Sequence, residues 1–260
     1  VITGICSMSI FFNTATGNRL IDNVNIVPEF IGKVTLSNSP SIGDVGSESG
    51  YRLHRYAGRM PATNERPYMV FWSIPASLSD VWWLPVDVVG FSGSAHVSSV
   101  IDAFFAPGTP MPAVLPEAYV FSLGPVEISP LKMAARVWDN AGRLLFDSGK
   151  MHLALQHAVG GMSVDFSTSV LALPSLSSKA AFLVPSVFHR REVYTQGDQE
   201  AIVTDWYACV RFTGGEMIAR LVQVYRTGVT PSQEWSYQQD HTYGNTTGLV
   251  LPVIDASIYD

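Results

Sequence analysis

The chain has 260 residues, of which 47% are hydrophobic and only 15% are charged, and its formal net charge is −6. This apolar content excludes an intrinsically disordered chain, and without a concentrated Lys/Arg surface we expect no nucleic-acid partner. The strongest apolar run, residues 69–78, is interrupted by Ser73, Pro75 and Ser77, so we expect no membrane span.

The first half of the chain is predicted to consist of short strands. The whole sequence contains 21 Gly and 16 Pro. They divide the chain into apolar runs of mostly four to eight residues, which is typical of an all-β protein. Residues 8–13 and 17–23 form the first predicted hairpin.

Residues 76–87 are compatible with one or two helical turns, but Pro75 and Pro85 bound them closely and the Trp82–Trp83 pair suits a strand equally well. Adjacent strand residues face opposite ways, so both rings cannot enter the same core. One of them is therefore expected between modules or subunits, although core packing is the commonest role of a single Trp. Trp82, Trp83 and Trp235 are the candidate binding residues, for a protein interface or for a sugar.

The second half begins with the clearest turn chemistry. Residues 133–138 and 143–146 flank a turn in which Asp139 can bond to the turn backbone and Gly142 can take a left-handed conformation. In residues 151–156, Met151, Leu153 and Leu155 alternate with more polar positions, which predicts a half-buried strand.

A third hairpin is predicted from residues 205–212 and 217–225. Gly214 and Gly215 lie between them and supply the positive φ values that tight hairpin turns require. Residues 231–235 could begin a short helix, but they carry no apolar stripe.

Two echoes indicate an internal repeat. Gly17 and Asp22 in the first hairpin have the same spacing as Gly142 and Asp147 in the second, and residues 100–103 repeat as residues 253–256. The predicted fold is therefore all-β, with little helix and two related antiparallel β-sandwich-like modules. These modules are expected over residues 1–128 and 129–260.

No pattern of catalytic or metal-binding residues is apparent. The sequence has no nucleophile elbow, phosphate-binding loop, dinucleotide-binding turn or close His pair with metal spacing. We therefore expect no catalytic residues, no metal and no cofactor; a hydrolase built on scattered carboxylates is the least favoured alternative. Cys6 and Cys209 are expected to be two unrelated buried thiols rather than a bridge.

Residues 137–150 resemble a segment common in small minor tail proteins of tailed bacteriophages. In that segment a strand ending in an aromatic residue and Asp/Asn turns through Gly into an apolar-Asp-Ser strand, as in Trp138, Asp139, Gly142, Asp147 and Ser148. The weaker first copy departs in carrying Asn23 in place of Ser and in its longer turn. The resemblance implies a virion component of the tail tip, baseplate or fibre-attachment region, with no catalytic residues to carry over.

The expected function is that of a non-enzymatic structural protein of a phage tail, located in the virion. Low charge suits a protein whose surface is largely covered by neighbours. Its expected partners are other virion tail proteins, with several copies in a symmetric assembly, and the isolated chain is expected to self-associate. The alternative is a carbohydrate-binding β-sandwich that recognises a host-surface glycan.

Overall fold

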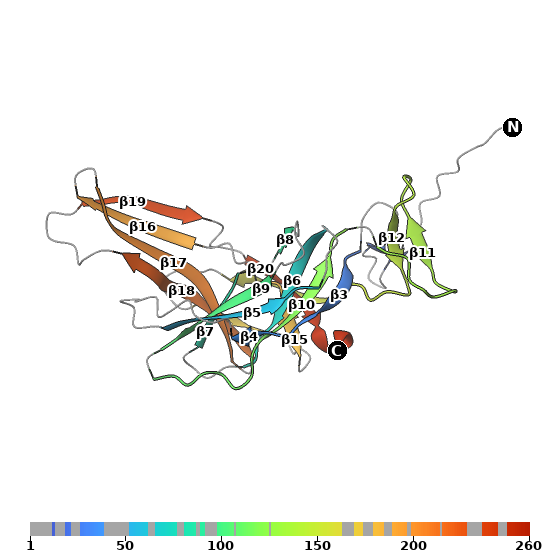
Figure 1. Cartoon of the computed structure of the whole chain (residues 1–260), viewed down its shortest axis with the longest axis horizontal. Helices are drawn as coiled ribbons and strands as arrows, with labels where there is room; N and C mark the ends of the chain where they lie inside the picture. The colour runs from blue at the N-terminus through green and yellow to red at the C-terminus, as the bar shows by residue number, and fades with distance from the viewer. Residues whose placement is uncertain are drawn as a thin grey trace.

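The computed structural model describes the chain in seventeen segments: residues 12–13, 19–21, 27–38, 52–61, 66–76, 81–86, 89–91, 98–106, 108–124, 126–162, 169–173, 179–184, 189–196, 199–213, 215–227, 236–243 and 249–260. These segments form two large antiparallel sheets and two small hairpins (Figure 1). The only helical element among them is a single 3₁₀ turn, η1 (Ala256–Tyr259). The predicted all-β class is confirmed.

The first sheet has seven strands, in the order β13-β20-β15-β6-β10-β3, with β8 paired to β6. The bounds of these strands are β3 Glu29–Val34, β6 Pro67–Ser73, β8 Val89–Phe91, β10 Glu117–Ser122, β13 Leu155–Met162, β15 Ala180–Phe182 and β20 Leu249–Asp255.

The second sheet has nine strands, in the order β14-β18-β17-β7-β9-β5-β4, with β16 paired to both β17 and β19. Their bounds are β4 Ser37–Asn38, β5 Arg52–Arg59, β7 Val81–Pro85, β9 Ser98–Phe105, β14 Ser169–Ala172, β16 His189–Gln196, β17 Gln199–Thr213, β18 Glu216–Thr227 and β19 Ser236–Tyr243.

Both large sheets combine strands from the two halves of the chain. Val210 of β17 pairs with Trp83 of β7, and Phe182 of β15 pairs with Trp72 of β6. One apolar core lies between the sheets and includes Trp72, Val120, Trp83, Ile101 and Val210. Strand pairing within both sheets therefore crosses the boundary expected at residue 128 between residues 1–128 and 129–260.

The three predicted hairpins are present. In β1 (Phe12–Asn13) and β2 (Arg19–Ile21), Phe12 pairs with Ile21. In β11 (Arg136–Trp138) and β12 (Leu144–Asp147), Val137 pairs with Phe146. The third hairpin joins β17 to β18 with Thr213 opposite Glu216.

The turn between β11 and β12 forms as its residues predict. The Asp139 carboxylate accepts hydrogen bonds from the amides of Ala141 (2.9 Å) and Arg143 (2.8 Å). Gly142 adopts φ +78°, a conformation that costs residues with a side chain more than it costs glycine. The hydrogen bonds of Asp139 and the conformation of Gly142, both within the turn, account for its formation.

Residues 76–87 contain the strand β7 rather than a helix. Trp82 and Trp83 point to opposite faces of the second sheet, as strand alternation requires. Trp83 packs in the core between the sheets, whereas Trp82 lies in a separate cluster with Leu84, Cys209, Ile218 and Val222. The guanidinium carbons of Arg211 and Arg220 lie 4.8 and 4.6 Å from the centre of the Trp82 ring.

Two sequence expectations need correction. The strand predicted from residue 151 begins only at Leu155, and Met151 and Leu155 are 55% and 58% exposed, so the alternation there does not mark a buried face. The four-residue echo also has unlike surroundings: Asp102 is a buried partner of Arg55, whereas Asp255 caps η1. The two Asp residues of the echo therefore differ in environment, whereas its Ile and Ala positions are buried in both copies.

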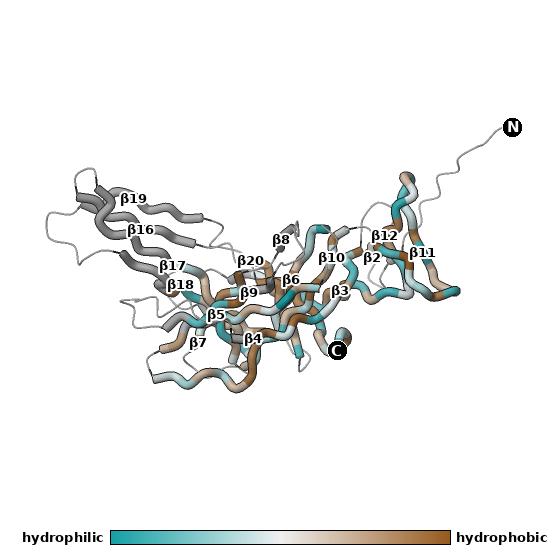
Figure 2. The backbone as a smooth tube through the Cα atoms, in the orientation of Figure 1, coloured by the Kyte–Doolittle hydropathy of each residue, from teal (hydrophilic) through white to brown (hydrophobic). Residues whose placement is uncertain are grey.

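The molecule is elongated (Figure 1). The β16–β19 strands extend from one end of the two-sheet body, and the β11–β12 hairpin stands at the other. Hydrophobic positions are frequent along the central strands (Figure 2). No helix long and apolar enough to cross a membrane occurs in the part of the chain that the structure describes.

Candidate functional site: the polar junction of the hairpin lobe

The β11–β12 hairpin and its flanking segments, residues 126–151, form a unit that we call the hairpin lobe. Backbone hydrogen bonds attach it to the body: the amide of Phe30 donates to the Met151 carbonyl (2.8 Å), and the amide of Leu153 donates to the Pro28 carbonyl (2.8 Å). The residues at the beginning of β3 therefore bind the C-terminal end of the lobe, around Met151.

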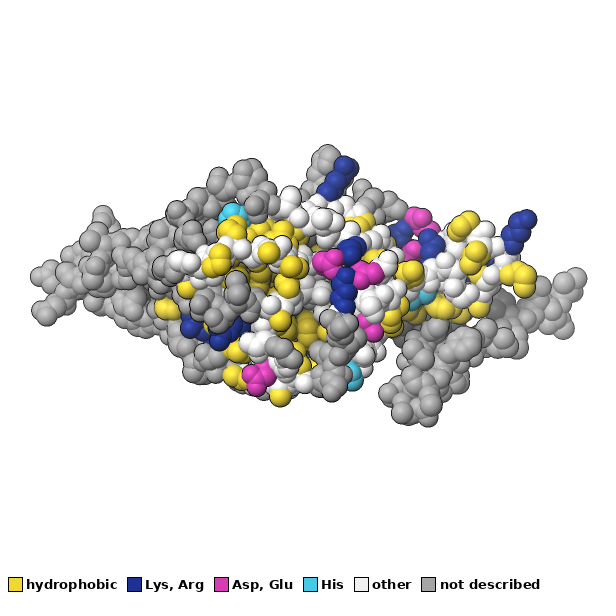
Figure 3. All heavy atoms as spheres, turned by 90° about the horizontal axis from the view of Figure 1, so that it is seen from below, with side chains coloured by type: hydrophobic (Ala, Val, Ile, Leu, Met, Phe, Trp, Pro, Cys, Tyr) yellow, Lys and Arg dark blue, Asp and Glu magenta, His cyan; other side chains and the backbone are white. Residues whose placement is uncertain are grey.

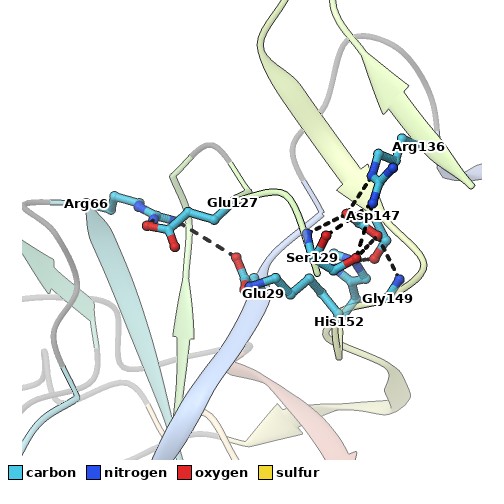
Figure 4. Close-up of polar contacts among 9 residues, drawn as sticks. Glu29, Arg66, Glu127, Ser129, Arg136, Asp147, Gly149 and His152 are labelled. Atoms are coloured by element: carbon cyan, nitrogen blue, oxygen red, sulfur yellow. Dashed lines mark hydrogen bonds and ion pairs between the residues drawn. The ribbon is translucent and has the colours of Figure 1, made fainter. Parts of the chain in front are cut away.

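A buried carboxylate, Asp147, lies inside the lobe, surrounded by residues of the lobe itself (Figure 4). It is fully buried and accepts four hydrogen bonds: from the Ser129 amide (2.8 Å) and hydroxyl (3.0 Å), the Gly149 amide (2.8 Å) and Arg136 Nε (2.9 Å). Burial alone would raise the pKa of Asp147. The hydrogen bonds from Ser129, Arg136 and Gly149 outweigh burial and hold the pKa well below its usual value.

Register and close packing explain why these groups meet. Arg136 and Asp147 are direct partners across the two strands of the hairpin. A Cβ at Gly149 would touch the Ser129 hydroxyl, so the absence of a side chain lets Ser129 approach the carboxylate. Arg136 also donates to the main-chain carbonyls of Ser129 (3.2 Å) and Leu131 (3.0 Å), which directs its guanidinium inward.

A second buried carboxylate, Glu29, connects the lobe to the body. It is 6% exposed and lies 3.0 Å from Lys150 Nζ of the lobe and 3.8 Å from an Arg66 nitrogen of the body. Arg66 also pairs with Glu127 of the lobe at 2.7 Å. These ion pairs fasten one side of the lobe to β3 and to the residue preceding β6.

Ser129, Asp147 and His152 are the residue types of a hydrolytic relay, but their arrangement is different. The Ser129 hydroxyl donates to Asp147 directly and is buried, and His152 Nε2 donates to the Asp147 main-chain carbonyl at 2.8 Å. The His152 ring stacks on Phe146 with centroids 4.6 Å apart. Among the described residues no imidazole contacts the Ser129 oxygen, whose hydroxyl is held by the Asp147 carboxylate instead.

Although the lobe contains many charged residues, several large apolar side chains are exposed on its surface. Met133 is 91% exposed and Trp138 is 46% exposed, and Ile128, Leu131 and Met151 are each more than half exposed. Most of the charged groups of the lobe are held in pairs, including Arg136 with Asp147, Arg143 with Asp139 and Lys150 with Glu29. Figure 3 shows hydrophobic side chains at the surface of this end of the molecule.

Two of the candidate binding residues are not available at the surface. Trp82 and Trp83 are 3% and 0% exposed, so neither can stack on a sugar ring. Trp235 lies outside the described residues. Trp138, which the sequence analysis used only as part of the hairpin pattern, is instead an exposed aromatic side chain.

A second ionic cluster lies at the end of η1. Lys33 and Lys179 contact both Glu117 and Asp260 at distances of 2.5–3.0 Å. The Tyr119 hydroxyl also contacts both carboxylates, at 3.1 and 2.9 Å. The two cations balance the two carboxylates, so this cluster ties η1 to β10 and β3.

Within the described residues no group of three or more His, Cys, Asp or Glu side chains is arranged to hold a metal ion. Cys209 is a buried free thiol, while Cys6 lies outside the described residues. No protein family model, curated protein or solved structure matches this chain.

Proposed function

We propose that this protein is a non-enzymatic structural component of a bacteriophage tail, in the tail tip, baseplate or fibre-attachment region. It acts through protein–protein interfaces with other tail proteins, in several copies. The family assignment rests on the resemblance of residues 137–150 to minor tail proteins. Those residues form the β11–β12 hairpin and the segment that follows it.

The observation that carries the proposal is the surface of the hairpin lobe. Large exposed apolar side chains mark candidate interaction sites, and Met133, Trp138 and Ile128 of the lobe are 91%, 46% and 66% exposed. Glu29 ties the lobe to the body through Lys150, and Asp147 ties the segments of the lobe to one another. A rigid apolar projection is suited to docking against a neighbouring protein.

Self-association of purified protein tests the role of this surface. The double variant Leu131→Ser/Met133→Ser removes exposed apolar area from the lobe. The control Val170→Ser/Val250→Ser removes exposed apolar area from β14 and β20, where both side chains are more than half exposed. We expect the wild-type chain and the control to associate with rising concentration in light scattering, and the lobe variant to need roughly tenfold more protein. A wild-type chain that stays monomeric at the highest concentration reached would count against the proposal.

The carbohydrate-binding alternative depends on one described side chain, Trp138, because an exposed aromatic ring can stack on a sugar. Binding on a glycan array that is lost in Trp138→Ala would favour it. If Trp138→Ala reduces self-association and the wild-type chain binds no glycan, the structural role is favoured instead.

A further inference from the structure

Three polar side-chain atoms in the core between the sheets have no hydrogen-bond partner among the described residues: His54 Nε2, Tyr56 Oη and Trp83 Nε1. Tyr56 is 1% exposed and Trp83 is 0% exposed. Buried polar groups in folded proteins are almost always hydrogen-bonded, to protein or to ordered water. Three such atoms on neighbouring strands make this region a candidate site for a hydrogen-bonding molecule such as ordered water.

The sheet places these three side chains around a small residue. His54 of β5 and Trp83 of β7 both pair with Ala103 of β9, the strand between them. Tyr56 lies two residues beyond His54 on β5 and therefore faces the same side. The Tyr56 ring centre is 4.9 Å from that of His54 and 5.9 Å from that of Trp83, so it lies between the two.

The donors and acceptors define what could bind there. The indole of Trp83 only donates, so its partner must offer a lone pair. Burial raises the pKa of Tyr56 to about 12, and its hydroxyl therefore stays protonated and can both donate and accept. His54 Nε2 can donate or accept, depending on the tautomer.

The charges of the neighbourhood favour a neutral ligand. Arg55 lies between His54 and Tyr56 on β5 and so points to the opposite face of the sheet, where Asp102 holds it at 2.7 and 2.8 Å. The core members around Ala103, such as Ile101, Phe105 and Val81, are apolar. A charged ligand would find no opposite charge among these apolar neighbours.

We propose that His54, Tyr56 and Trp83 form an internal binding site for a small neutral molecule that both donates and accepts hydrogen bonds. In aqueous solution this molecule is water. The site lies beside Ala103, between the two sheets. It goes beyond the proposed role in assembly and does not depend on that role. Water bound there would accept from Trp83 and link the two other side chains.

The effect of Tyr56→Phe on stability distinguishes a satisfied hydroxyl from an unpaired one. If water pairs with the hydroxyl, its removal breaks that hydrogen bond and lowers the unfolding midpoint; if the hydroxyl has no partner, its removal relieves a cost and raises the midpoint. Tyr119→Phe is the matched control, because the Tyr119 hydroxyl has known partners and its loss should lower the midpoint. A Tyr56→Phe variant with an unchanged or raised midpoint would overturn the proposal.

A second measurement does not depend on any substitution at Tyr56. In the wild-type chain with ¹⁵N-labelled indoles, we expect the Trp83 Nε1 proton to show a cross-peak to long-lived water in a rotating-frame NOE experiment. Trp83→Phe identifies the signal. A Trp83 indole proton without a water cross-peak would contradict the proposed site.

Discussion

Asp147 is the buried carboxylate around which the segments of the hairpin lobe pack. Its carboxylate accepts hydrogen bonds from Ser129 and Gly149 and forms an ion pair with Arg136, its partner across the hairpin. The resemblance to tail proteins includes this Asp, and its role here gives a physical reason for an Asp at that place. An Asp that follows an apolar strand residue can fold the flanking segments around its carboxylate.

We predict that Asp147→Asn lowers the free energy of unfolding by about 3 kcal/mol, because it leaves Arg136 partly buried without its counter-charge. Urea unfolding measures this loss. The control is Glu127→Gln, which alters a side chain that is 60% exposed and should cost less than about 1 kcal/mol. Equal effects of the two substitutions would contradict the role assigned to Asp147.

The cluster at the end of η1 makes a separate contribution that depends on pH. Hydrogen bonds from Lys179 and Lys33 hold the pKa of Asp260 at about 2, below its ordinary value of 3.8. The folded state binds the proton more weakly than the unfolded chain, so the contribution of Asp260 is present above 3.8 and is lost as the pH falls towards 2.

We therefore expect Asp260→Asn to lower the unfolding midpoint by a constant amount near neutral pH, and this difference from wild type to shrink as the pH falls through 3.8 towards 2. Thermal unfolding across this range measures the difference. A gap between variant and wild type that is the same at both ends of the range would show that Asp260 is not ion-paired in the folded protein.

At the level of the elements, the packing of the segments that flank the β11–β12 hairpin depends on Gly149, which follows β12. A Cβ at Gly149 would lie 2.8 Å from Ser129 Cβ and 2.9 Å from Leu131 Cδ1, whereas at Gly215, in the β17–β18 turn, a Cβ would meet nothing within 4 Å. The same substitution therefore has different consequences in the two hairpins.

We predict that Gly149→Ala destabilises the protein by about 1–3 kcal/mol, because Ser129 must move away from Asp147. Gly215→Ala should change the free energy of unfolding by no more than about 0.5 kcal/mol. Urea unfolding of the two variants side by side tests this. If Gly149→Ala is as mild as Gly215→Ala, the segment around Ser129 is less closely packed than described.

At the level of the whole molecule, local and distant interactions differ in what the sequence can predict. Gly142 and Asp139 predict their hairpin because the turn is formed by neighbouring residues. The pairing of Val210 with Trp83 joins residues more than a hundred positions apart, and no local pattern specifies which strands meet. For this reason the three hairpins could be predicted, whereas the order of the strands in the two sheets could not.

The candidate site shows the same limit. Asp147 stood out because it repeats the spacing of Asp22, but Glu29 and Arg66 carry no signal in the sequence, since they reach the lobe only through the fold. Alternation of Trp82 and Trp83 was predicted correctly, whereas the exposure of Trp138 depends on how the lobe stands away from the body.

The most direct test of the proposed function is quantitative mass spectrometry of phage particles purified from the host that carries this coding sequence. We predict that the chain fractionates with intact tails at a fixed number of copies per particle. We also predict that the Leu131→Ser/Met133→Ser variant, whose substitutions lie on the exposed face of the hairpin lobe, is depleted from those particles. A chain that is absent from purified particles and remains in the free protein fraction would contradict the account.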